Sequence, residues 1–390
     1  MPYTHFQYLA YQTPTFGRDN VNNLWRSSLA AGELCDAVND IPVPDNLGLS
    51  DDAKKRLRRL AAVVNEAHDS LVGDQNTTLK VFMAPEFYFR PESGANSYSY
   101  AQSERGKILV ALGLMFKNAK FDHWLIVAGT IIANIPKLPR PALPPYHYFY
   151  NTAIVIKGGT NCRLTAIEKN QPSGIDGVPV TGGISNPNVA GGNYTNHYST
   201  WNERKQRMFR QDGVQMGLDI CLDHAGPVAF NVGGIIYPQD TLRMAKRVSN
   251  ESINQPPLPA PLPDISLHLL TAGGMPIVTQ SVAAKNNGYI LRTDGHPGMA
   301  THIELKRINN YTTPAGNTTP YNMATGNPQL PIAVGGSTSN FPNCPTANLT
   351  NVLPVGTVPL TGKMKIPIDA QYNPTNMTQA IVMFPVTALP

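Results

Sequence analysis

The chain has 390 residues, of which 42% are hydrophobic and 15% charged, and its formal net charge is +5. This length can bury a substantial core in one or two domains, and so slight a positive charge gives no basis for a nucleic-acid-binding protein. No stretch approaches the roughly 18 consecutive apolar residues of a membrane-spanning helix, so we expect no membrane association. The densest basic cluster, Lys54–Arg59, lies in a helix-like stretch and is typical of a solvated helix face.

The N-terminal residues and the cysteines bear on the cellular compartment. Met1–Phe6 has no basic segment followed by an apolar one, so no secretory signal is predicted and a cytoplasmic protein is the default expectation. Cys35, Cys162, Cys221 and Cys344 lie far apart without a Cys-x-x-Cys pair, which indicates neither a disulfide framework nor a zinc site. Free thiols agree with a reducing compartment.

The first half of the chain alternates between strand and helix patterns. Residues 5–11 predict a first strand, and the segment from Asp19 to Cys35 could be helical. The clearest helix follows Ser50, which supplies an N-cap, because apolar residues recur at helical spacing from there to Leu71. The same criteria predict three further elements: a strand at 79–84, a helix at 102–118 and a strand at 124–133.

Strand patterns dominate the second half, which together with the first half predicts an α/β layered sandwich. Pro-rich residues 136–145 and a glycine-rich stretch that runs from Lys169 to about residue 200 are expected to be loops. From about residue 309 Pro, Thr and Asn dominate, which predicts an irregular extension. Strands are predicted at 147–157, 163–169, 214–221, 264–270, 276–283, 288–293 and 301–307.

Three of the predicted strands end in chemically active side chains. Glu86 ends one apolar run, Lys169 a second and Cys221 a third, and we expect the three strand ends to converge on one pocket. A thiol attacks a carbonyl or nitrile carbon as the thiolate, so it needs a base, which a glutamate can be. A lysine ammonium would favour the thiolate and stabilise the tetrahedral intermediate, and the backbone N–H of Leu222 could complete the oxyanion hole.

These segments resemble the motifs of the nitrilase, or carbon–nitrogen hydrolase, superfamily. The family has an apolar strand ending in Pro-Glu, a strand ending in Lys and a Gly-rich strand ending in Cys. This chain matches them with Met83-Ala84-Pro85-Glu86, Ala166-Ile167-Glu168-Lys169 and the run Gly217–His224. Supporting matches are Ala128-Gly129-Thr130 and the run Tyr150–Ile156, which is similar to the family's Tyr-Asn-Ser/Thr-Ala strand. The resemblance covers most of the chain up to about residue 307.

The resemblance implies a fold, three roles and a mode of assembly. The fold would be a four-layer αββα sandwich over residues 1–308, with an irregular Pro/Asn/Thr-rich extension at 309–390 packed on the same or a neighbouring subunit. Glu86 would be the general base, Lys169 the transition-state stabiliser and Cys221 the nucleophile that forms a thioester or thioimidate. No metal or organic cofactor is implied. The partners would be a small-molecule amide or nitrile substrate and further copies of the chain in a homo-oligomer.

Several features depart from the family pattern. Asn170-Gln171 follows Lys169 where the family often has a histidine, and residues 224–227 replace the family's Arg-Phe-Pro. Glu203 is the only glutamate between Lys169 and Cys221, and it matches poorly the additional glutamate that many members place there. The long interval between Lys169 and Cys221 indicates an enlarged lid over the site. The changes after Lys169 and at residues 224–227 would fall in the pocket wall, so they concern the substrate more than the chemistry.

Other residues have both functional and structural explanations. Tyr88 could contact substrate, with core packing an equal alternative, and His224 could line the site or form a dyad with Cys221. Asp223 and His224 could bind a metal, but no further ligand has suitable spacing, so no metal site is predicted. The turn Ala272-Gly273-Gly274 lacks a nucleotide-binding pattern and is interpreted as lining the pocket.

The sequence therefore predicts an enzyme that hydrolyses a non-peptide carbon–nitrogen bond, foremost an amide, through acylation of Cys221. Acyl transfer to an amine on the same fold is one alternative. A binding or effector protein that keeps the three residues without turnover is another.

Overall fold

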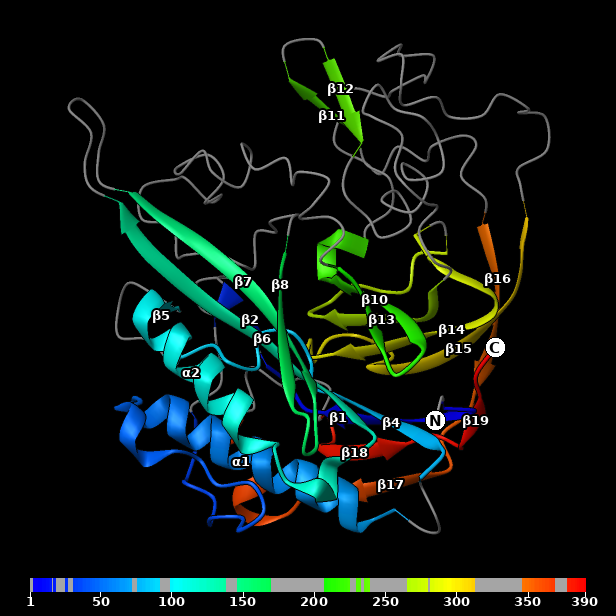
Figure 1. Cartoon of the computed structure of the whole chain (residues 1–390). Coiled ribbons are helices and arrows are strands. Elements are labelled where there is room, and N and C mark those ends of the chain that lie inside the picture. The colour runs from blue at the N-terminus through cyan, green and yellow to red at the C-terminus, as the bar shows by residue number, and fades with distance from the viewer. Residues whose placement is uncertain are drawn as a thin grey trace.

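The computed structural model is a mixed α/β fold in which two β-sheets lie face to face and two α-helices cover one of them (Figure 1). Both counts refer to the part of the chain that the structure describes. No helix in that part combines the length and the hydrophobicity needed to cross a membrane. The described residues are 3–15, 17–18, 25–26, 31–71, 76–91, 99–137, 146–169, 207–224, 229–232, 235–238, 265–279, 281–312, 346–368 and 377–390.

The first sheet contains nine strands, with the central order β17-β18-β1-β4-β6-β7-β8. Strands β1, β4 and β6 run parallel, and the other neighbours along this order are antiparallel. Strand β5 pairs with β6, and β19 pairs with β1. The bounds are β1 His5–Gln12, β4 Thr78–Met83, β5 Tyr100–Ala101, β6 Trp124–Lys137, β7 Tyr146–Lys157, β8 Arg163–Glu168, β17 Gly356–Pro359, β18 Ala380–Met383 and β19 Thr387–Ala388.

The two helices, α1 (Asp51–Asp69) and α2 (Gln102–Met115), pack on the outer face of this sheet (Figure 1). Helix α1 begins where the sequence predicts, because the Ser50 hydroxyl accepts a hydrogen bond from the Ala53 N–H and acidic residues occupy the first turn. Its apolar stripe, which includes Leu57, is buried in a core shared with the outward side chains of β1, β4 and β6.

The second sheet has six strands in the order β16-β15-β14-β13-β10-β9. Strands β10, β13 and β14 run parallel, and the outer neighbours are antiparallel. Its apolar inner face packs against the inner face of the first sheet, and this second core also takes in Cys221. The bounds are β9 Met208–Gln211, β10 Val214–Ile220, β13 Ile265–Ala272, β14 Ala284–Asp294, β15 Ile303–Thr312 and β16 Thr346–Val352.

The carboxyl ends of the parallel strands in both sheets meet at one end of the sandwich. The Thr271 hydroxyl, on β13, donates to the carbonyl of Ala84, just after β4, at 3.2 Å. The Thr15 N–H, just after β1, donates to the carbonyl of Gly295, just after β14, at 3.0 Å. Side chains that follow these strands are therefore gathered at this end, as is usual for ligand sites on parallel strands.

The C-terminal residues belong to both sheets, which corrects the expected boundary at residues 308 and 309. Strand β15 continues across that position to Thr312 and pairs with β16. Strand β18 lies between β1 and β17 in the first sheet. Proline and asparagine richness misled the prediction, because short strands on existing sheets need few apolar residues. The segments 346–352, 356–359 and 380–383 thus pair with strands of the two sheets in the same chain.

Two other predicted elements differ from those observed. The expected strand 276–283 is not formed by its described residues, since β14 begins only at Ala284. In the expected helix at 19–35, Trp25–Arg26 instead forms β3, which pairs with β2 (Gly17–Arg18). The glycine-rich loop from 170 to about 200 lies outside the described residues. The remaining short elements are η1 Asp45–Leu47, η2 Ala119–Phe121, η3 Cys221–His224, η5 Gly362–Met364 and the β11–β12 pair, Ala229–Val232 with Ile235–Pro238.

Candidate active site

Glu86 and Lys169 form a fully buried ion pair at the shared end of the strands. Lys169 Nζ lies 2.9 Å from Glu86 Oε1, and neither side chain is exposed to solvent. The Asn151 amide, on β7, donates to the same Glu86 oxygen at 2.8 Å. The Lys169 backbone N–H donates to the Asn151 carbonyl at 2.8 Å, so β7 holds the lysine as well. Two of the three predicted catalytic residues are therefore brought into direct contact.

The backbone around Glu86 is shaped by a bulge in β6. The register between β6 and β7 shifts between Val127 and Thr130, and Gly129 has a left-handed φ of +75°. A Cβ at Gly129 would lie 2.5 Å from the Pro85 carbonyl oxygen, so only glycine allows this close approach. Phe87, also left-handed at φ 64°, donates its N–H to the Thr130 hydroxyl at 2.9 Å. The Ala-Gly-Thr motif thus supports the turn that presents Glu86.

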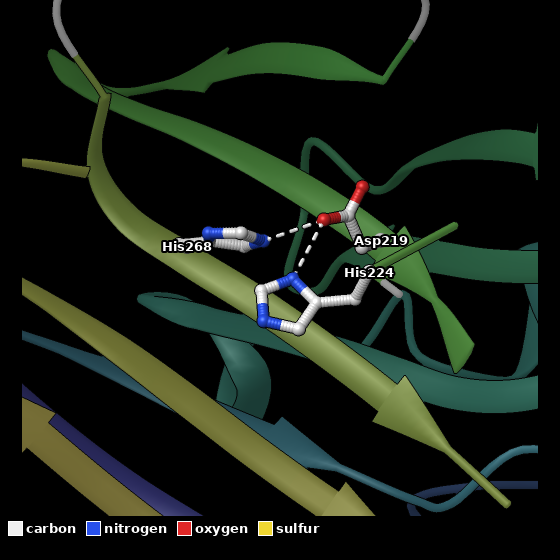
Figure 2. Close-up of side chains that lie close together, drawn as sticks. All are labelled: Asp219, His224 and His268. Carbon is white, nitrogen blue, oxygen red and sulfur yellow. Dashed lines mark hydrogen bonds and ion pairs between the residues drawn. The ribbon is translucent and has the colours of Figure 1, made fainter. Parts of the chain in front are cut away.

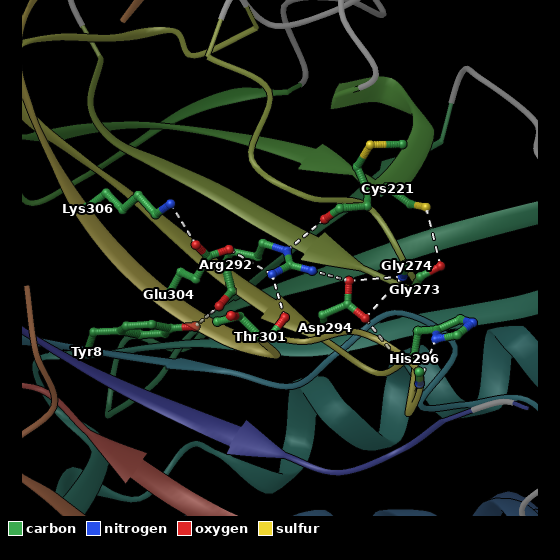
Figure 3. A network of polar contacts seen from close by, with 12 residues as sticks. Tyr8, Cys221, Gly273, Gly274, Arg292, Asp294, His296, Thr301, Glu304 and Lys306 are labelled. Carbon is green, nitrogen blue, oxygen red and sulfur yellow. Dashed lines mark hydrogen bonds and ion pairs between the residues drawn. The ribbon is translucent and has the colours of Figure 1, made fainter. Parts of the chain in front are cut away.

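Cys221 begins the short turn η3 directly after β10. It is 3% exposed and has a left-handed φ of 46°, which costs a non-glycine residue about 1–2 kcal/mol. Its thiol donates a long hydrogen bond, 3.9 Å from Sγ to oxygen, to the Gly273 carbonyl (Figure 3). Because that contact favours the protonated thiol, a base must remove the proton before Cys221 can act as a nucleophile.

A buried polar network holds the loop that carries Gly273 (Figure 3). The Asp294 carboxylate accepts the backbone N–H of Gly274 at 2.9 and 3.0 Å and that of His296 at 2.7 Å. Arg292 donates to Asp294 at 2.7 Å and to the Met275 carbonyl at 2.6 Å. The Gly273 carbonyl is thereby fixed beside the Cys221 thiol, and the expectation that this turn lines a pocket stays a prediction.

A second buried cluster joins Asp219 on β10, His268 on β13 and His224 in the turn η3 (Figure 2). Asp219 Oδ2 is 3.0 Å from His224 Nδ1 and 3.0 Å from His268 Nε2, and all three residues are fully buried. Burial alone raises the pKa of Asp219, but the hydrogen bonds from the two histidines outweigh it and hold the pKa well below its usual range. Burial lowers the pKa of His224, assisted by His268 and opposed by Asp219.

This cluster has the composition of a metal site, and its ligand atoms lie within 4.8 Å of one another. Its hydrogen bonds do not fit a metal, however. The Ala283 N–H donates to His268 Nδ1 at 3.1 Å, so the ring proton is on Nε2, the atom that faces Asp219. A metal on Nε2 would require a proton on Nδ1, opposite the Ala283 N–H. The cluster therefore acts as a hydrogen-bonded anchor for the turn that begins at Cys221.

Arg207 connects the turn η3, which begins at Cys221, to the end of strand β8, which directly precedes Lys169. It is 2% exposed and donates to the Glu168 carbonyl at 3.4 Å and to Asp223 Oδ2 at 2.6 Å. It also lies 3.5 Å from Asp219 Oδ1. The ends of β8 and β10, on different sheets, are thus held by one guanidinium.

The residues expected to bind substrate have different positions. Tyr88 packs in the core under the helices, where its hydroxyl donates to the Arg56 carbonyl at 3.0 Å, so the packing alternative is the one observed. His224 is buried against Asp219. Leu222 lies in the turn η3, directly after Cys221, and its role in the oxyanion hole stays a prediction.

Sequence reasoning missed Asn151, Arg207 and the partnership of Asp219 with His268. Asn151 could have been found from the sequence, because it is the Asn of the Tyr-Asn-Thr run that resembles the family motif. Asp219 and His268 meet only because β10 pairs with β13, and no local pattern shows that pairing.

No family model matches the chain, and no curated protein matches it significantly.

Proposed function

We propose that this chain is a thiol hydrolase of the nitrilase type, which cleaves a non-peptide carbon–nitrogen bond, foremost that of an amide. The four-layer αββα arrangement is part of the proposal, and the helical layer with its two stacked sheets supports it. The proposal extends to a small-molecule substrate and a homo-oligomeric assembly.

The observation that carries the proposal is the buried Glu86–Lys169 pair. Burying both charges costs several kcal/mol per ion, which their attraction rarely repays in full, so such a pair is weak evidence for stability. A function explains it better, because a carboxylate and an ammonium in a water-poor site are strong catalytic groups. The sequence places them at strand ends that share an end of the sandwich with Cys221.

The proposed reaction uses the three residues in turn. Glu86 takes the proton of the Cys221 thiol, and the thiolate attacks the amide carbon to give a tetrahedral oxyanion. Lys169 and the Leu222 N–H stabilise this oxyanion. The intermediate collapses, the protonated Glu86 gives its proton to the leaving amine, and a thioester remains. Water, deprotonated by Glu86, then attacks the thioester and releases the acid with the free thiol.

The test is intact-mass spectrometry of the wild type and of Cys221→Ala after mixing with a panel of small amides and nitriles. We expect a transient acyl adduct on the wild type alone, together with formation of the acid. Adding an amine separates hydrolysis from acyl transfer, because only a transferase would convert the adduct mainly to the new amide. An adduct that persists in Cys221→Ala would contradict the mechanism.

A further inference from the structure

Arg207 makes its contacts where the two sheets come together, directly before β9. Its guanidinium donates to the carbonyl of Glu168, the residue that precedes Lys169 in the first sheet. It also reaches Asp219 and Asp223, which lie two residues before and two residues after Cys221 in the second sheet. One buried side chain therefore spans the neighbours of two proposed catalytic residues.

The backbone of Arg207 is also hydrogen-bonded to β10, the strand that precedes Cys221. Its carbonyl accepts the Leu218 N–H at 3.0 Å, three residues before Cys221. Because the main chain of Arg207 is bonded to β10, its guanidinium links the end of β8 directly to the turn η3. A shift of either strand end would break at least one of these contacts.

Arginine suits this position for chemical reasons. Its planar guanidinium offers five N–H donors in a rigid fork, so it can serve a carbonyl and two carboxylates at once. A lysine would supply the charge from a single point and could not reach all three acceptors. Without this cation, Asp219 and Asp223, whose carboxylates both contact the guanidinium, would be two like charges in a buried region, where repulsion is strong.

We propose that Arg207 is a positioning residue that sets the Lys169 ammonium against the Cys221 thiol. This inference rests on the proposed function and adds a residue that acts through Lys169 rather than on the substrate. The three strand ends alone would leave the spacing between ammonium and thiol to the packing of two separate sheets. Arg207 adds a direct connection between the ends of β8 and β10 to the contacts with Asn151 and Glu86 that already hold Lys169.

The experiment measures the rate of Cys221 alkylation by iodoacetamide against pH, with peptide mass spectrometry to identify the thiol. The variants are Arg207→Met and Arg207→Lys. We expect Arg207→Met to move the pH midpoint upward by about one unit or more, because an ammonium near a thiol favours the thiolate by that order. Arg207→Lys should give an intermediate shift.

Arg105→Met is the matched control. Arg105, on α2, contacts the Glu168 carboxylate from the helix side, at the same residue but away from the Cys221 turn. The control should leave the midpoint unchanged. An equal shift in Arg105→Met would show a general disturbance of β8 and would overturn the inference.

A double-mutant cycle with Lys169→Met tests whether Arg207 acts through the lysine. In the Lys169→Met background, Arg207→Met should produce no further shift, whereas an additive shift would contradict positioning. If Arg207→Met does not fold, the double variant Arg207→Met/Asp223→Asn replaces it in the cycle, because it removes both charges of the closest ion pair together. An unchanged midpoint in a folded Arg207 variant overturns this inference alone, while a wild-type Cys221 no faster than the other thiols overturns the proposed function.

Discussion

Two buried polar clusters differ in where they lie: Glu86 with Lys169 follows strands of the first sheet, and Asp219 with His224 and His268 belongs to the second sheet and its turn η3. Leu218 and Ile220 point into the core between the sheets, so Asp219, which lies between them on β10, points to the outer face with its histidines. Lys169 follows Ile167 by two residues and faces the space between the sheets, where it meets Glu86. The Glu86–Lys169 pair therefore faces the space between the sheets, whereas Asp219 and its histidines lie on the outer face of the second sheet.

The two clusters are equally buried but differ in composition and in the hydrogen bonds that they form. In the outer cluster both histidines direct N–H groups at Asp219, and the tautomer of His268 is fixed by the Ala283 N–H. Its hydrogen bonds hold one arrangement of the turn. In the Glu86–Lys169 cluster a carboxylate and an ammonium, the base and the oxyanion stabiliser of the proposed reaction, lie at the ends of two strands.

The largest effect is expected when the inner pair is broken. Glu86→Gln and Lys169→Met should each lower turnover by about a thousandfold or more, the order found for lost oxyanion donors and general bases. Lys169→Met should also lower the free energy of unfolding by roughly 3–5 kcal/mol, because it removes the ammonium that the buried Glu86 carboxylate contacts. The double variant should recover stability in urea unfolding yet stay inactive. A double variant that turns over substrate would contradict the catalytic role of the pair.

The outer cluster predicts a pH dependence of stability. The pKa of His224 is lowered in the folded state. As pH falls below about 6.5, His224 therefore becomes protonated in the unfolded chain while it stays neutral in the native protein. His224 therefore reduces the free energy of unfolding progressively from that pH downward. Asp219, whose folded pKa is also lowered, adds stability that is lost only below about pH 4.

Urea unfolding of His224→Gln at several pH values measures this contribution. The variant should show a flatter pH profile between about pH 7 and 5, where an unfolded histidine titrates. Part of the slope should persist, because burial also lowers the pKa of His296 and His302. A slope equal to that of the wild type would show that His224 is not part of a buried anchor.

The smallest effect is expected at Tyr88. Tyr88→Phe removes the hydrogen bond to the Arg56 carbonyl and should cost about 1 kcal/mol of unfolding free energy. The Michaelis constant should not change, since the ring packs under the helices on the far face of the first sheet. A raised Michaelis constant with unchanged stability would instead indicate that Tyr88 contacts the substrate.

Local sequence patterns predicted the elements that local physics decides. The cap at Ser50 and the apolar periodicity behind it located α1, and apolar runs located the strands before Glu86 and Cys221. The place of β18 beside β1 could not be read locally, because four residues near the C-terminus gain their stability from a partner strand near the N-terminus. The Asp219–His268 contact spans 49 residues and depends in the same way on strand register.

The most direct test of the account compares the alkylation rates of Cys35, Cys162, Cys221 and Cys344 in the wild-type protein across pH. Burial raises the pKa of Cys35 and of Cys162, so both should react slowly near neutral pH. We predict that Cys221 reacts fastest, with a low pH midpoint that Lys169→Met moves upward. Slow and equal labelling of all four thiols, unaffected by Lys169→Met, would contradict a catalytic Cys221.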